Sequence, residues 1–155
     1  MKNKEIIEKF YRSFSANDIE GMLECYHENI QFEDPAFGKL EGERAKNMWR
    51  MLLTNAKGNM KLSYSAIEAD EHKGSANWVA EYVFSQTGRK VVNHVSAKFE
   101  FQNGKIIKHT DKFNLYAWAK QGMGVTGFLI GWTSFFKKKF QEKANRSLDK
   151  FSAKL

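Results

Sequence analysis

The sequence contains few of the residues that mark secreted or metal-binding proteins. Its one cysteine, Cys25, excludes an intramolecular disulfide and a cysteine-based zinc site. The histidines and carboxylates do not fall at a metal-ligand spacing such as His-x-x-x-His, so we expect no metal. No segment has the roughly 18 apolar residues of a membrane span, and the N-terminus lacks the apolar core of a signal peptide. We therefore expect a cytoplasmic protein without a membrane span.

Proline is equally scarce, and the only one, Pro35, follows Asp34 in the stretch from Phe32 to Gly38. Proline cannot donate a hydrogen bond to a β-ladder, and it biases the residue before it toward extended backbone. Asp34 is therefore predicted to end a strand. A carboxylate in this place either transfers protons or accepts hydrogen bonds from the backbone of the following turn, and the sequence leaves both roles open.

Aromatic residues, by contrast, are abundant, with 13 Phe, 5 Tyr and 4 Trp in 155 residues. A chain of this length fits one domain with one hydrophobic core. An aromatic interior is typical of proteins that hold apolar ligands. The net charge of +7 is concentrated, because Thr133 to Leu155 has seven Lys and Arg against two acidic residues. Since the rest of the chain is nearly neutral, we expect no nucleic acid partner.

Helical spacing of apolar residues predicts three helices in the first third of the chain. The first ends near Ser15, and the second is short, begins at a capping Asn17 and buries Tyr26. A third includes Ala45 to Leu53. Between the second and third helices, Ile30 to Asp34 is predicted to be a strand, followed by a loop.

After Asn59 the apolar period changes to two, and turn signals at Asp70 to Gly74, Thr87-Gly88 and Asn103-Gly104 separate four predicted strands. This pattern indicates an antiparallel meander. Alternation places these residues on one face: Ala76, Trp78, Ala80, Tyr82, Phe84, Asn93, Val95, Ala97, Phe99, Phe101, Ile107, His109, Asp111 and Phe113.

His109 and Asp111 thus point with apolar residues. A carboxylate in such surroundings is costly unless it is paired, so we expect an Asp111–His109 pair. The pair is either a structural network or the machinery of acid–base catalysis.

The chain turns helical again at Tyr116 and ends in a basic helix capped by Thr133 or Ser134. We interpret the final helix as packing a phenylalanine stripe on the body with a solvated lysine face. Contact of this helix with anionic lipid is therefore not expected. The glycine-interrupted run from Gly122 to Trp132 is interpreted as a lid over a pocket.

Three helices, a strand ending in Asp34-Pro35 and a meander closing with Phe99-x-Phe101-x-x-Gly104-Lys105-Ile106 resemble the NTF2-like superfamily, and most closely its SnoaL-like and ketosteroid-isomerase-like branch. The resemblance implies an α+β cone, in which a strongly bent, mainly antiparallel sheet wraps around N-terminal helices. It also implies a domain over residues 1–115, a helical extension over 116–155 packed on the same domain, and a homodimer.

By the same resemblance, Asp34 matches the general base of ketosteroid isomerases. Phe10 and Ala97 stand where those enzymes have their oxyanion tyrosine and aspartate, so ketosteroid isomerisation itself is not expected. Asp111 matches the acid–base aspartate of SnoaL-like polyketide cyclases, and a histidine near the base resembles scytalone dehydratase.

The sequence therefore predicts a cofactor-independent acid–base enzyme for a small apolar cyclic ligand, with Asp34, His109 and Asp111 as catalytic residues. The predicted pocket is lined by Phe10, Tyr26, Phe37, Trp49, Trp78, Tyr82, Asn93, Ala97, Phe99 and Phe113. The alternative is a non-catalytic ligand-binding or dimerisation module of the same fold.

Overall fold

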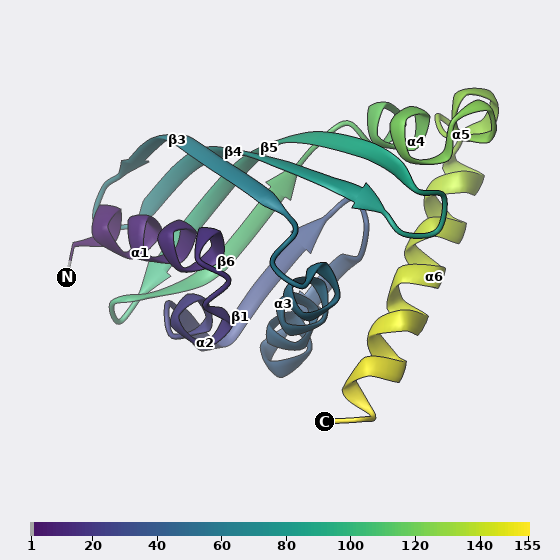
Figure 1. Cartoon of the computed structure of the whole chain (residues 1–155). Coiled ribbons are helices and arrows are strands. Elements are labelled where there is room, and N and C mark those ends of the chain that lie inside the picture. The colour runs from purple at the N-terminus through teal and green to yellow at the C-terminus, as the bar shows by residue number, and fades with distance from the viewer. Residues whose placement is uncertain (1) are drawn as a thin grey trace.

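The computed structural model describes residues 2–155 (Figure 1). The elements are α1 (Asn3–Ser15), α2 (Ile19–Leu23), β1 (Tyr26–Asp34), β2 (Gly38–Glu41), α3 (Gly42–Ala56), β3 (Lys61–Ala69), β4 (Lys73–Phe84), β5 (Arg89–Gln102), β6 (Lys105–Lys112), α4 (Leu115–Met123), α5 (Val125–Ile130) and α6 (Ser134–Ser152).

The six strands form one sheet in the order β2-β1-β6-β5-β4-β3. Only β1 and β6 are parallel neighbours, and the other pairs are antiparallel. The helices α1, α2 and α3 cover one face of this sheet, and α6 runs beside α3 (Figure 1). The predicted α+β class, the meander and the bent, mainly antiparallel sheet are confirmed.

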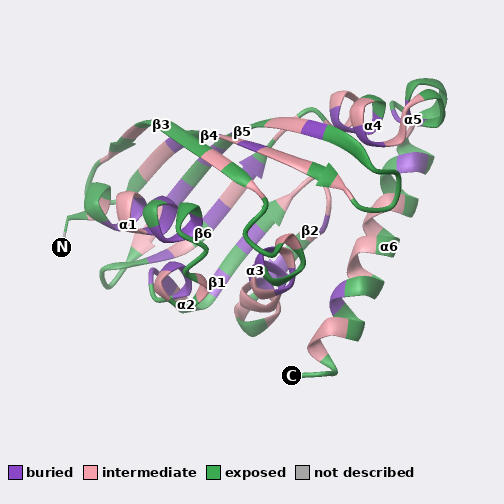
Figure 2. Ribbon diagram, in the orientation of Figure 1, coloured by how far each residue is buried: buried purple, intermediate pink, exposed green. Residues whose placement is uncertain are grey.

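The alternation read from the sequence corresponds to the two faces of the sheet. In β5, Val95, Ala97 and Phe99 are buried beneath the helices, whereas Ser96 and Lys98 between them are exposed (Figure 2). A period of two in burial follows because successive side chains of a strand point to opposite faces.

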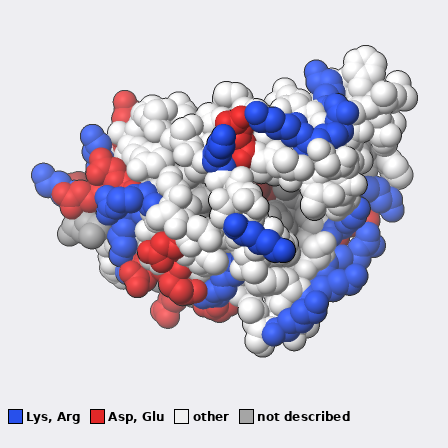
Figure 3. Space-filling model, in the orientation of Figure 1, with Lys and Arg blue, Asp and Glu red and all other residues white. Residues whose placement is uncertain are grey.

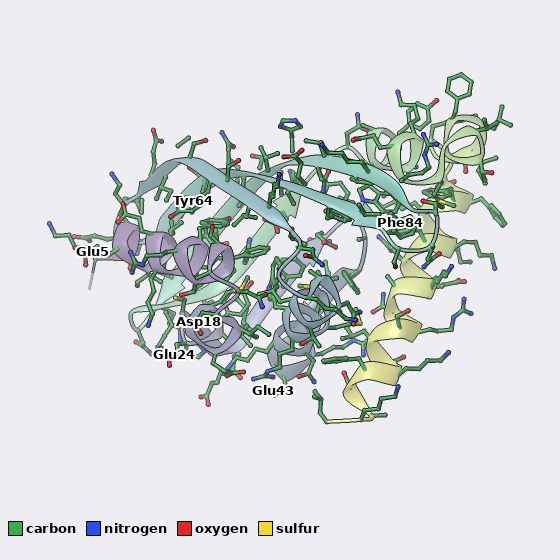
Figure 4. All side chains as sticks on the ribbon, viewed as in Figure 1. Glu5, Asp18, Glu24, Glu43, Tyr64 and Phe84 are labelled. Atoms are coloured by element: carbon green, nitrogen blue, oxygen red, sulfur yellow. The ribbon has the colours of Figure 1, made fainter. Side chains whose placement is uncertain are left out.

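The second predicted helix was placed too long. It ends at Leu23, and Tyr26 opens β1 instead, because Ile106 of β6 donates its N–H to the carbonyl of Cys25 at 2.8 Å and draws the chain into the sheet. The N-cap is also one residue later than predicted. Asp18, labelled in Figure 4, accepts from the Gly21 N–H at 3.0 Å, while Asn17 adopts a left-handed backbone.

The predicted loop after Pro35 is partly a strand. β2 pairs antiparallel with β1, with Asp34 opposite Gly38, so Asp34 opens a hairpin turn. Gly38 has a φ of +74°, which a residue with a side chain rarely adopts. Four residues are too few for a period of two to show in the sequence.

The final helix, α6, donates hydrogen bonds to the turn between Asp34 and Gly38. Its predicted Thr133 cap is confirmed, because Thr133 Oγ1 accepts from the Phe136 N–H at 3.0 Å. Gln141 donates to the Pro35 carbonyl at 3.0 Å, and Asn145 donates to the Phe37 carbonyl at 2.9 Å. α6 therefore fixes the backbone on which the Asp34 side chain is held.

Candidate functional site

The side chain of Asp34 closes the β1–β2 turn. Its Oδ1 accepts from the N–H of Ala36 at 3.0 Å and of Phe37 at 2.7 Å. Burial, helped by the charge of Asp111, nevertheless raises the pKa of Asp34 to about 7, against the lowering effect of these hydrogen bonds. The structural role foreseen for Asp34 is thus present, together with a protonation equilibrium near neutral pH.

Asp70 provides an internal comparison, because it makes the same kind of turn. Its Oδ1 accepts from the N–H of His72 at 2.8 Å and of Lys73 at 2.7 Å. Asp70 is exposed, and these hydrogen bonds lower its pKa. Since the hydrogen bonds of the two aspartates are alike, desolvation accounts for the opposite shift at Asp34.

The parallel pairing of β1 with β6 brings Asp34 and Asp111 together. Phe32 pairs with His109 and Glu33 with Thr110, so the register carries Asp34 next to Asp111. The effect of the Asp111 charge on the pKa of Asp34 is consistent with this proximity. The structure therefore brings the three predicted catalytic residues to one part of the inner face.

His109 and Asp111 belong to a buried hydrogen-bond network. His109 Nε2 lies 2.8 Å from Asp111 Oδ1, which also accepts from Trp78 Nε1 at 3.3 Å. On the other side of the ring, His109 Nδ1 lies 2.7 Å from the Tyr26 hydroxyl, which accepts from Trp49 Nε1 at 2.9 Å. The predicted Asp111–His109 pair is present, and two tryptophans and a tyrosine complete it.

The donors in this network assign the histidine tautomer. An indole N–H only donates, so the Tyr26 oxygen accepts from Trp49 and is free to donate its own proton to His109 Nδ1. The ring proton is then on Nε2 and is donated to Asp111. If Nδ1 also carried a proton, the Tyr26 hydroxyl would lack an acceptor among its partners. A neutral His109 therefore satisfies every group.

The network is closed to solvent. His109 is 0% exposed and Asp111 3%. The aromatic rings of Phe10, Phe99 and Trp49 surround the imidazole, with the His109–Phe99 centroids 4.5 Å apart. Asp34, by contrast, is half-buried, so it is the member of this group that a ligand can reach.

The residues predicted to line a pocket divide into two groups. Most of them are packed in the main core: Phe10, Tyr26, Phe37, Trp49, Trp78, Ala97 and Phe99. Tyr82, Asn93 and Phe113 are half-buried. Of these, Tyr82 and Phe113 contact both the main core and a second cluster that α4 and α6 form around Trp118 and Phe136.

Tyr82 stands out at this junction. Its hydroxyl oxygen accepts from Trp118 Nε1 at 2.6 Å, and the Trp118 ring also packs edge-on against Phe84, which Figure 4 labels, with centroids 4.9 Å apart. Burial raises the pKa of Tyr82, and the charge of Asp34 adds to that rise. With its pKa raised, the Tyr82 hydroxyl keeps its own proton and can donate it in a further hydrogen bond. The sequence indicated Tyr82 only as pocket wall, because nothing in the pattern pairs it with Trp118.

Within residues 2–155, His, Cys, Asp and Glu side chains form no group of three that could hold a metal ion. A hollow of about 640 Å³ lies on the outer face of the sheet, away from His109, and its polar lining includes Lys98, Glu100 and Lys112. Among the predicted site residues, Asp34 and Tyr82 are half-buried ionisable groups, and they are therefore the candidate ligand contacts.

Residues 7–109 match the model of the SnoaL-like domain family. The chain belongs to this family. The match includes Asp34 and His109 but ends before Asp111 and the three C-terminal helices. A comparison with curated proteins gives no match.

Several solved structures share the fold of this chain. TerC, co-crystallised with polyporic acid, is similar with a TM-score of 0.65 and 18% identity over 76% of this chain and 95% of its own. An LEH-like epoxide hydrolase of M. tuberculosis gives a TM-score of 0.60 and 19% identity over 81% of this chain and 92% of its own. An NTF2-like protein of unknown function from Cytophaga hutchinsonii gives a TM-score of 0.60 and 15% identity, over 73% and 100%. These likenesses confirm the NTF2-like cone.

Proposed function

We propose that this SnoaL-like protein is a cofactor-independent acid–base enzyme whose proton-transfer group is Asp34 and whose ligand is a small apolar ring compound with a carbonyl, hydroxyl or epoxide oxygen. The observation that carries the proposal is the half-buried Asp34 carboxyl, with a pKa of about 7. Near pH 7 both the carboxylate and the acid are populated, which suits a group that takes and returns a proton.

The chemistry follows from the groups around Asp34. The ionised carboxylate removes a proton from a carbon next to a carbonyl or from a hydroxyl, and the resulting acid returns it at another atom, so the protein is unchanged. Tyr82 donates a hydrogen bond to the ligand oxygen on which charge develops. Trp118, which donates to the Tyr82 oxygen at 2.6 Å, holds that hydroxyl in place.

In this proposal Asp111 and His109 are positioning residues. Asp111 acts on Asp34 through its charge, which helps to hold the pKa near neutrality. His109 fixes the Asp111 carboxylate from behind, and the Tyr26 hydroxyl fixes His109.

The experiment is a screen of cyclic ketones, hydroxy ketones and epoxides with the wild type, Asp34→Asn and Asp70→Asn. The amide of Asp34→Asn retains an oxygen acceptor for the turn, so the fold is expected to survive. We expect the Asp34 variant to lower kcat by about 10²- to 10⁴-fold and to abolish an inflection near neutral pH in the rate profile, while Asp70→Asn leaves both unchanged. An unchanged kcat in Asp34→Asn would refute the assignment of Asp34.

Dense packing favours a second candidate, a non-catalytic ligand-binding module. Phe10, Trp49 and Phe99 are each at most 2% exposed, as in an ordinary core. A module of this kind predicts a rise in Tm with bound compounds and no turnover of any of them. Tyr82→Phe separates the two candidates, because it lowers kcat in the enzyme and changes only affinity in the module.

The other expectations from the sequence complete the proposal. We propose that residues 116–155 are an extension of the same domain as residues 1–115, supported by the hydrogen bonds of Gln141 and Asn145 to the Asp34 turn. A homodimer and a cytoplasmic location remain predictions. Size-exclusion chromatography with light scattering measures the first, and cell fractionation the second.

A further inference from the structure

The end of the molecule formed by α5 and the start of α6 exposes large apolar side chains. We call this set the apolar tip: Val125 (75% exposed), Phe128 (60%), Leu129 (61%), Ile130 (41%), Trp132 (69%) and Phe135 (64%). Six such residues within eleven positions form a local concentration, whereas exposed apolar residues elsewhere are scattered. Concentrations of this kind mark contact surfaces.

The apolar tip is held rigidly, because α5 turns its smallest residues toward the body. A Cβ atom on Gly127 would lie 1.9 Å from the Ala119 carbonyl oxygen, and one on Gly131 would lie 2.7 Å from the Ala119 Cβ. Tyr116 also donates to the Phe128 carbonyl at 2.9 Å. The glycines of this segment thus face the body, and its large apolar side chains face outward. The lid interpreted for Gly122 to Trp132 stays a prediction.

Basic residues dominate the charge near the tip, although Lys139 also lies 3.6 Å from Glu142. From Lys112 to Gln141 the chain has no acidic residue, while Lys120, Lys137, Lys138 and Lys139 are exposed. In Figure 3 the surface over α5 is uncharged, with Lys and Arg along α6 beside it. Lys139 and Lys120 lie over the rings of Phe135 and Tyr116, so the cations border the apolar surface directly.

We propose that the apolar tip docks on the surface of a membrane that contains anionic lipid. Trp and Phe side chains with aliphatic neighbours insert at the boundary of headgroups and acyl chains, and lysines beside them attract anionic headgroups. The core of a protein interface is instead depleted in lysine, which favours lipid over a second copy of the chain. Among residues 2–155 no helix is long and apolar enough to cross a membrane, so the contact is peripheral.

The sequence alone favoured a solvated basic face on the last helix and no lipid contact. The structure adds the outward orientation of Phe128, Trp132 and Phe135. Periodicity could not show that of Phe128, because α5 has only six residues.

The test is co-sedimentation of the full chain with vesicles of phosphatidylcholine alone and of phosphatidylcholine with phosphatidylglycerol. We expect binding to the anionic vesicles that weakens with salt, and a blue shift of tryptophan fluorescence. The shift reports Trp132, because Trp49, Trp78 and Trp118 are buried. Leu155→Ser is the control for Trp132→Ser, because Leu155 is equally exposed but lies beyond the other end of α6.

We expect the triple variant Phe128→Ser, Leu129→Ser, Trp132→Ser to weaken binding at least about tenfold, with Leu155→Ser unchanged. Reversal of Lys137, Lys138 and Lys139 to Glu is expected to weaken binding by at least about tenfold, more than the same reversal of Lys4, Lys61 and Lys98. No binding to anionic vesicles, or equal binding by the triple variant, would overturn the proposal. So would a wild-type dimer that the triple variant makes monomeric without any vesicle binding, since a second copy would then be the occupant.

Discussion

Two buried tyrosines of the same core offer a matched test of the hydrogen-bond network. Tyr26 and Tyr11 are 3% and 0% exposed, and both rings contact Phe10. The Tyr26 hydroxyl joins Trp49 to His109. The Tyr11 hydroxyl is buried and has no hydrogen-bond partner among residues 2–155. Replacing each tyrosine by Phe removes one oxygen and leaves the ring in place.

The two substitutions should affect the free energy of unfolding differently. Tyr26→Phe leaves two buried groups unpaired, the Trp49 N–H and His109 Nδ1, and each costs about 1–3 kcal/mol, so the free energy of unfolding should fall by about 2–6 kcal/mol. Tyr11→Phe removes a buried hydroxyl that is already unpaired. Its effect should therefore range from neutral to a stabilisation of about 1–3 kcal/mol.

The assay is urea unfolding of the wild type and both variants, followed by circular dichroism, with the m-value as a check that the same surface is exposed. The stacking of Tyr11 on Tyr64, which Figure 4 labels, is retained in Tyr11→Phe because it involves only the ring. Equal destabilisation by the two substitutions would refute the network, since the Tyr26 hydroxyl would then contribute no more than an unpaired one.

Three further predictions concern the turn, the last helix and the free thiol. Because the folded pKa of Asp34 is raised to about 7, the native state binds the extra proton and the wild type loses stability as pH rises from about 4 to 7. The stability of Asp34→Asn relative to the wild type should therefore rise over this range, by at most about 4 kcal/mol. For Asp70→Asn the difference should stay nearly flat from pH about 4 to 7, because the lowered pKa of Asp70 confines its effect to pH below about 4. Urea unfolding at both ends of the range measures both differences, and a flat difference for Asp34→Asn would count against the reasoning. Thr133→Ala should lower the free energy of unfolding by about 1 kcal/mol, because it removes the N-cap of α6. Thermal unfolding measures this, and an unchanged Tm would contradict it. Burial raises the pKa of the Cys25 thiol, so a thiol reagent should modify it only slowly until urea is added, and rapid native labelling would show the opposite.

The sequence predicts the parts of this fold that have a regular period or a turn signal. The meander, the inward faces of β4 and β5 and the Asp111–His109 pair follow from alternation. In β6 the prediction of an inward Ile107 was wrong, because a register shift against β5 buries Ile106 instead and leaves Ile107 half-buried. β2 was missed because a strand of four residues is too short to show a period of two. Tyr26 was misjudged because its conformation is set by pairing with β6, a strand distant in the chain. Local pattern carries no information on such pairing.

The candidate site was predictable only in part for the same reason. Asp34 was found because Pro35 follows it, and His109 and Asp111 because they interrupt an apolar face. The donors that complete the site, Trp49 and Trp118, come from α3 and α4. No sequence pattern in either helix predicts that its indole N–H donates to a tyrosine of the sheet.

The most direct test of the proposed role of Asp34 is its own titration. Carboxyl ¹³C resonances of aspartate-labelled protein, with Asp34 assigned by its absence in Asp34→Asn, give the pKa of this group. We expect a pKa of about 7 for Asp34, set mainly by burial. A pKa for Asp34 at or below the ordinary value near 4 would show that the turn hydrogen bonds dominate and would contradict a proton-transfer role.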